Sequence, residues 1–103
     1  MIRTLHKDGH DLPLLICDIC DTWIEGTGEA AAVWKTARVA GDASAVLHVH
    51  KRGCHAAAEQ SLGGKVNCSW EELGTHFLYL LGNTGLTPEQ LQALQDRNQK
   101  FGL

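Results

Sequence analysis

The sequence of 103 residues predicts an α+β fold, in which small β-hairpins surround a metal site and a C-terminal helical hairpin follows. Short β-type runs, separated by glycine-containing turns, predict the hairpins between residues 2 and 50. Two pairs of metal-ligating side chains lie on either side of the second predicted hairpin. Apolar residues at helical spacing, preceded by capping signals, predict the two helices within residues 69–103.

The composition indicates a single domain, residues 1–103. Hydrophobic residues make up 44% and charged residues 20% of the chain, as is typical of globular rather than disordered proteins. No apolar run has the length of a membrane span, and residues 1–15 lack the apolar segment of a signal peptide. We therefore expect a cytoplasmic protein without a membrane partner. In that reducing compartment, the four cysteines favour metal ligands or buried thiols over disulfides.

The chain is expected to begin with a β-hairpin. Residues 2–6 and 11–16 are short β-type runs on either side of an Asp-Gly pair, and both of these residue types tolerate the positive φ angles of a tight hairpin turn. Pro13 fits an edge strand, because an edge position needs no ladder donor. The second strand then leads directly into Cys17.

Residues 30–36 can be read as a helix or as a strand, because alanines favour the first and the β-branched and aromatic residues favour the second. A turn at residues 40–43 would pair this segment with residues 44–50, so we expect a second hairpin. His48 and His50 then lie on the same face of the later strand, because side chains alternate along a strand. Both histidines could approach a nearby pair of cysteines.

A short helix is expected over residues 56–62, which are rich in alanine, and Gly63-Gly64 ends it. Cys54 lies at the start of this helix. We expect the positive end of the helix dipole to help stabilise a Cys54 thiolate.

The last third of the chain is predicted to be a helical hairpin, residues 69–103, packed on the part before it. Ser69 and Glu72 have the spacing of a capping box for a helix over residues 70–83. Thr87, followed by proline, is typical of the start of another helix. The apolar residues of that second helix form a single stripe, made up of Leu91, Leu94 and Phe101.

Two groups of soft ligands predict one metal site. The first is a Cys-x-x-Cys turn, which is the spacing of a zinc knuckle, and the residues after it do not form the helix that a redox pair would need. The second group lies at the start of the predicted central helix. The predicted ligands of one Zn²⁺ ion are Cys17, Cys20, His50 and Cys54. His48 and Cys68 are the alternatives to His50 as the fourth ligand.

The order of Cys17-x2-Cys20, a β-hairpin, and His50-x3-Cys54 leading into a helix resembles the treble-clef class of zinc fingers. The resemblance covers residues 12–63, which we treat as a zinc-binding module. It implies that a knuckle supplies the first two ligands and the start of a helix supplies the last two. In such fingers the second pair is more often two residues apart. The class includes nucleic-acid binders, protein binders and nucleases, so the resemblance does not fix a function.

The sequence therefore predicts a small, non-enzymatic zinc-binding protein that acts through contact with another protein. Four protein ligands leave no open position on the metal for a reactive water. The apolar helices at residues 70–101 are the expected contact surface, for a partner or for a second copy of the chain. The chain has twelve acidic and nine basic residues, and its net charge is −3. This charge does not favour binding to nucleic acid, which remains an alternative partner.

The competing prediction is a metal-dependent nuclease or hydrolase of treble-clef type. Such an enzyme needs a general base beside an open metal position. The candidate bases are His48, His55 and His76.

Overall fold

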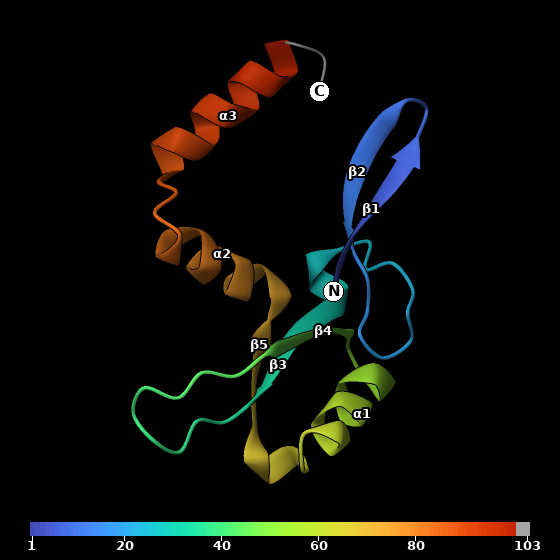
Figure 1. Cartoon of the computed structure of the whole chain (residues 1–103), viewed down its shortest axis with the longest axis vertical. Helices are drawn as coiled ribbons and strands as arrows, with labels where there is room; N and C mark the ends of the chain where they lie inside the picture. The colour runs from blue at the N-terminus through green and yellow to red at the C-terminus, as the bar shows by residue number, and fades with distance from the viewer. Residues whose placement is uncertain (101–103) are drawn as a thin grey trace.

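The computed structural model describes residues 1–100, and the side chains of residues 1–98. It contains two small antiparallel sheets and three α-helices, which confirms the predicted α+β class (Figure 1). The two-stranded sheet consists of β1 (Ile2–Lys7) and β2 (His10–Leu15). The three-stranded sheet has the order β4-β3-β5, with β3 (Ala30–Lys35), β4 (Val46–His50) and β5 (Cys68–Glu72). The helices are α1 (Gly53–Ser61), α2 (Leu73–Asn83) and α3 (Pro88–Lys100), and two short 3-10 turns are η1 (Thr27–Glu29) and η2 (Lys65–Asn67).

The first hairpin has the predicted turn. β1 and β2 pair along their whole length, beginning with Ile2 opposite Leu15. Asp8 and Gly9, the two residues between the strands, have φ angles of 53° and 77°. Positive φ at both positions is the geometry of a two-residue turn that matches the twist of the strands.

The segment that could be read as helix or strand is β3, the centre of the three-stranded sheet. It pairs antiparallel with β4, as predicted, and on its other side with β5. Its first four residues, Ala30 to Val33, are fully buried, because α1 and α2 both pack against this strand. A strand covered on both faces is apolar throughout rather than alternating. Alanine is small enough to let the helices approach closely.

The predicted capping box at Ser69 and Glu72 is wrong. Residues 68–72 form β5, and α2 begins only at Leu73. The Ser69 hydroxyl lies 2.7 Å from the Thr36 hydroxyl, and the side chain of Glu72 makes no capping hydrogen bond. Pairing with the open edge of β3 satisfies the backbone of this whole segment, which outweighs a local cap.

The start of α3 agrees with the prediction. The Gln90 N–H donates to Thr87 Oγ1 at 3.1 Å, and the Thr87 N–H donates to Gln90 Oε1 at 3.0 Å. These reciprocal bonds are a capping box. The helix therefore begins where Thr87 and Pro88 predicted it.

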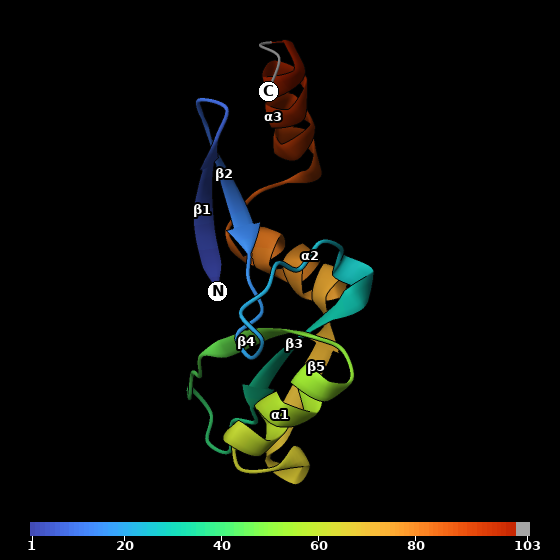
Figure 2. The same cartoon turned by 90° about the vertical axis from the view of Figure 1, so that its right-hand side faces the viewer.

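The arrangement of the two C-terminal helices differs from the expected hairpin. Gly85, with φ of 80°, turns the chain after α2. In both Figure 1 and Figure 2, α3 then leads away from α2 instead of returning along it. Leu91 and Leu94 remain 36% and 37% exposed, too small an apolar stripe to hold the helices together, and Phe101 lies outside the described residues. The division into a module at residues 12–63 and a helical part stays a prediction.

α2 is the more apolar of these two helices, and residues 1–98 cover one side of it. Leu73 is buried and Phe77 is half-buried against the sheet, whereas Leu78 is 69% exposed. The buried side of α2 therefore closes the core of the domain.

Among residues 1–100, no helix is long and apolar enough to cross a membrane.

We predict that Leu73→Ala lowers the free energy of unfolding by about 2–5 kcal/mol, because it removes one of the largest fully buried side chains and leaves a cavity. Leu78→Ala, on the exposed side of the same helix, is the matched control and should change the value by less than about 0.5 kcal/mol. Urea unfolding followed by circular dichroism measures both. Equal effects of the two substitutions would contradict this assignment of the core.

Candidate metal site

The structure brings the four predicted site residues together. The sulfur atoms of Cys17, Cys20 and Cys54 and one ring nitrogen of His50 all lie within 4.8 Å of one another. Ligand atoms around a tetrahedral zinc, with Zn–S distances of about 2.3 Å, lie about 3.8 Å apart. Movements of about 1 Å would therefore bring the four atoms into contact with one ion. Within residues 1–98, this is the one group of His, Cys, Asp or Glu close enough to hold a metal ion.

Cys17 and Cys20 lie in a tight loop after β2. The Cys17 N–H donates to the Thr22 carbonyl at 2.9 Å, and an isolated antiparallel bridge joins Ile16 to the residue after Thr22. Asp21, with φ of 63°, occupies the left-handed position of this loop, where glycine is common in zinc knuckles and where aspartate is tolerated. The loop therefore presents both sulfurs on one side.

Asp18 fastens this loop to β4. Its N–H donates to the His48 carbonyl at 2.9 Å, and its Oδ2 accepts the His48 N–H at 2.8 Å. The two bonds hold the cysteine loop beside the strand that carries His50. Asp18 could not be predicted as a positioning residue, because its neighbours in the sequence do not indicate that its carboxylate accepts a hydrogen bond from the distant His48 backbone.

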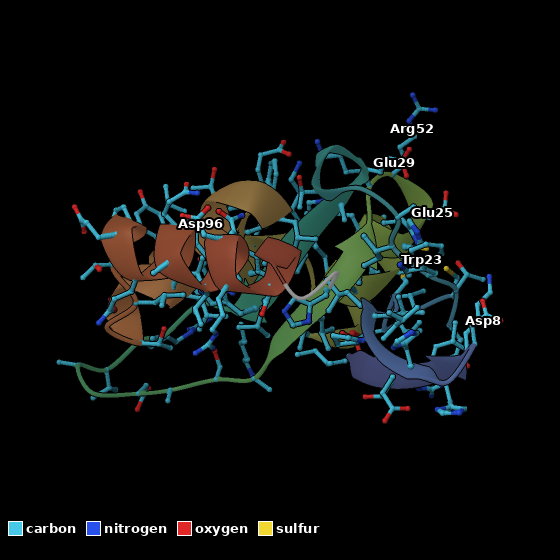
Figure 3. The ribbon with its side chains drawn as sticks, turned by 90° about the horizontal axis from the view of Figure 1, so that it is seen from above. Asp8, Trp23, Glu25, Glu29, Arg52 and Asp96 are labelled. Carbon is cyan, nitrogen blue, oxygen red and sulfur yellow. The ribbon has the colours of Figure 1, made fainter. Side chains whose placement is uncertain are left out.

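His50 is oriented for binding through Nδ1. That nitrogen lies 3.3 Å from the Cys20 sulfur, and the opposite nitrogen, Nε2, donates to the Trp23 carbonyl at 3.2 Å. With the proton on Nε2, the lone pair of Nδ1 faces the three sulfurs. The Trp23 carbonyl thus selects the tautomer that can bind a metal ion, and Figure 3 shows Trp23 close to the sulfur atoms.

Cys54 reaches the cluster through an unusual backbone conformation. Arg52, just before α1, has φ of 70° and ψ of −116°, a combination that residues other than glycine rarely adopt. Its side chain extends into solvent (Figure 3), so side-chain packing does not impose this conformation. The unusual backbone angles of Arg52 accompany a sharp change of chain direction between β4 and α1. This change brings His50 and Cys54 into the same cluster.

The two alternative ligands lie elsewhere. His48 shares a face with His50, and its backbone bonds to Asp18, but its ring lies apart from the sulfur atoms, with Nδ1 3.9 Å from Asp18 Oδ2. The His48 ring packs 6.4 Å from the Phe77 ring, between centroids. The Cys68 thiol, on β5, donates to the Glu59 carbonyl at 3.6 Å. Neither belongs to the cluster.

The thiols of the cluster influence one another strongly. Hydrogen bonds from the hydroxyl and backbone of Thr22 lower the pKa of Cys20 to about 6. Burial, followed by hydrogen bonds and charges from Cys17 and Cys20, raises the pKa of Cys54 to about 11. A raised pKa is the opposite of the direction that we expected from the helix dipole. A divalent cation at the centre of the cluster would lower the pKa of Cys54, because the cation stabilises thiolates.

The remaining histidines make separate contacts. The His55 ring packs edge-on against Trp70, with 5.0 Å between centroids, and its Nε2 lies 3.7 Å from Glu59. His76 shares a 2.7 Å hydrogen bond with Glu71. Neither histidine belongs to the cysteine cluster.

Comparison of the chain with protein-family models, curated proteins and solved structures finds no match. The geometry of the cluster and the chemistry of its four donors are therefore the observations that point to a function.

We predict that Asp18→Ala weakens metal binding about 10-fold or more, because the carboxylate bond to β4 is lost and only the backbone bond to the His48 carbonyl remains. Asp18→Asn is the control, since its amide oxygen can still accept the His48 N–H. Competition with a chromophoric chelator measures both affinities. If Asp18→Ala binds the metal as tightly as the unmodified protein, the link between the loop and the strand does not organise the site.

Proposed function

We propose that the Cys3His cluster binds one Zn²⁺ ion. Three thiols and one imidazole form a donor set that suits zinc, whereas magnesium and calcium take oxygen ligands. The cluster contains no carboxylate. The match between this donor set and the tetrahedral preference of zinc carries the proposal.

We further propose that the ion is structural. Its four ligands come from three segments that are distant in sequence: the loop after β2, the end of β4 and the first turn of α1. Cys17 is fully buried and belongs to the hydrophobic core with Val33, Val49 and Leu73. An ion bound there joins these segments, so its binding energy becomes folding energy.

We also propose that the protein acts through contact rather than through catalysis at this ion. Four protein donors complete the coordination of zinc, so no position is left for a reactive water. The order of cysteine loop, hairpin and helix supports the treble-clef interpretation, in which such sites support binding surfaces. The net charge of −3 favours a protein partner over nucleic acid.

The alternative, a hydrolase, would need a histidine that acts as a base beside an open metal position. All three candidate bases instead lie outside the cluster: His48 packs near Phe77, and His55 and His76 lie close to Glu59 and Glu71. This arrangement favours a role for them in packing. We therefore assign no catalytic residue.

We predict that purified protein carries about one zinc ion per chain, with three sulfurs at about 2.3 Å and one nitrogen at about 2.0 Å. X-ray absorption spectroscopy at the zinc edge measures this environment. A spectrum without sulfur neighbours would contradict the site. An additional oxygen neighbour would contradict the closed coordination, and would favour the hydrolase.

Cysteine variants provide a matched comparison for this test. Cys20→Ser should lose most of the bound zinc, because it removes one of the four ligands. Cys68→Ser should retain about one ion per chain, because its thiol lies outside the cluster. Equal losses in both variants would show that the ion is held in another way.

A further inference from the structure

The hairpin β1–β2 and helix α3 lie at the same end of the molecule, away from the three-stranded sheet (Figures 1 and 2). The radius of gyration is 15.9 Å, compared with about 13 Å for a compact domain of this length. The molecule is thus extended toward this end. We call the hairpin and α3 together the distal end.

The surface area indicates how much of the protein lacks cover. The chain exposes 7,435 Å², whereas a compact monomer of 11.2 kDa exposes roughly 5,700 Å². The excess is about 1,700 Å² per chain. The excess belongs to the whole chain, including exposed side chains of α2 such as Leu78, so about 3,400 Å² is the upper limit of what two chains could bury together, and obligate homodimers bury about 2,000 Å² or more.

Apolar side chains occupy both parts of the distal end. Leu5 and Leu12 lie opposite each other in the hairpin, so they share one face, and they are 46% and 43% exposed. Leu91 and Leu94 form the partly exposed stripe of α3. A groove of ≈ 700 Å³ separates the tip of the hairpin from Asn98 on α3.

Neither part is expected to be stable as it stands. An isolated two-stranded hairpin is marginal in water, and so is an isolated helix of fewer than about 15 residues. Within residues 1–98, the apolar face of the hairpin and the apolar stripe of α3 both remain partly exposed. Each part therefore offers the kind of surface that the other lacks.

The charges of the distal end suit a second copy of the chain. The hairpin carries two basic and two acidic residues, and α3 carries two of each, although the whole chain has a net charge of −3. These residues are Arg3, Lys7, Asp8 and Asp11 in the hairpin, and Glu89, Asp96, Arg97 and Lys100 in α3. A surface with no net charge can face its own copy without repulsion, and it does not attract nucleic acid.

We propose that the distal end is the interface of a homodimer, in which α3 of each chain packs on the hairpin of the other. A two-fold axis relates the two chains, so α3 of the first chain packs on the hairpin of the second and α3 of the second packs on the hairpin of the first. The distal end of each chain is thus the same self-complementary surface. The interface does not include the metal site, so it can be tested independently of the identity of the ion.

Sedimentation equilibrium of the full chain, from about 1 µM to about 1 mM, tests the proposal. The expected mass rises with concentration to twice 11.2 kDa. Leu94→Glu in α3 and Leu12→Glu in the hairpin should each weaken the dimer at least about 10-fold, because each buries a charge at the interface. Both variants should contain as much metal as the unmodified protein does. An unchanged metal content would show that the core remains folded.

The controls introduce a charge on the opposite faces. Gln92→Lys is on the polar side of α3, where the lysine can still pair with Asp96, and Thr4→Glu is on the other face of the hairpin from Leu5. Neither should change the dimer. A protein that stays monomeric at all concentrations would overturn the proposal. In that case the distal end would be covered by another protein, or by α3 folding back on the hairpin of its own chain. Equal weakening by variants and controls would also overturn it.

Discussion

The convergence of four ligands from three distant segments is the constraint on which the rest of the structure depends. Cys17 and Cys20 arrive from the first hairpin, His50 from β4 and Cys54 from α1. Cys17 is also part of the core, fully buried together with the side chains of β3 and α2. The cluster and the core therefore share one packed centre, and neither can form without bringing the same segments together.

The core itself is small, so an ion bound at the proposed site would have a large effect on stability. The four largest fully buried side chains are those of Leu73, Val33, Val49 and Cys17, and the central strand contributes mostly alanine. Alanines bury little apolar area, so their contribution to stability is modest. Chains of this size gain less from burial than larger domains do, and a structural metal commonly supplies the difference.

Local chemistry made much of this structure predictable. The Asp8-Gly9 turn, the cap at Thr87 and the spacing of the cysteines each reflect a preference of a few neighbouring residues. The tertiary pairings were harder to predict. Residues 68–72 resemble the start of a helix and are a strand, because the open edge of β3 offers them a partner. Likewise, the role of Asp18 depends on a strand 30 residues away.

The central claim is that an ion at the cluster holds the domain together, and hydrogen exchange of the metal-loaded and chelator-treated protein tests it most directly. If the claim is correct, removal of the ion lowers the protection of amides in residues 12–63, above all in the cysteine loop and β4. The amides of α3, which lies away from the site, should exchange at the same rate in both samples. Unchanged protection of the cysteine loop and β4 after complete removal of the ion would contradict the account.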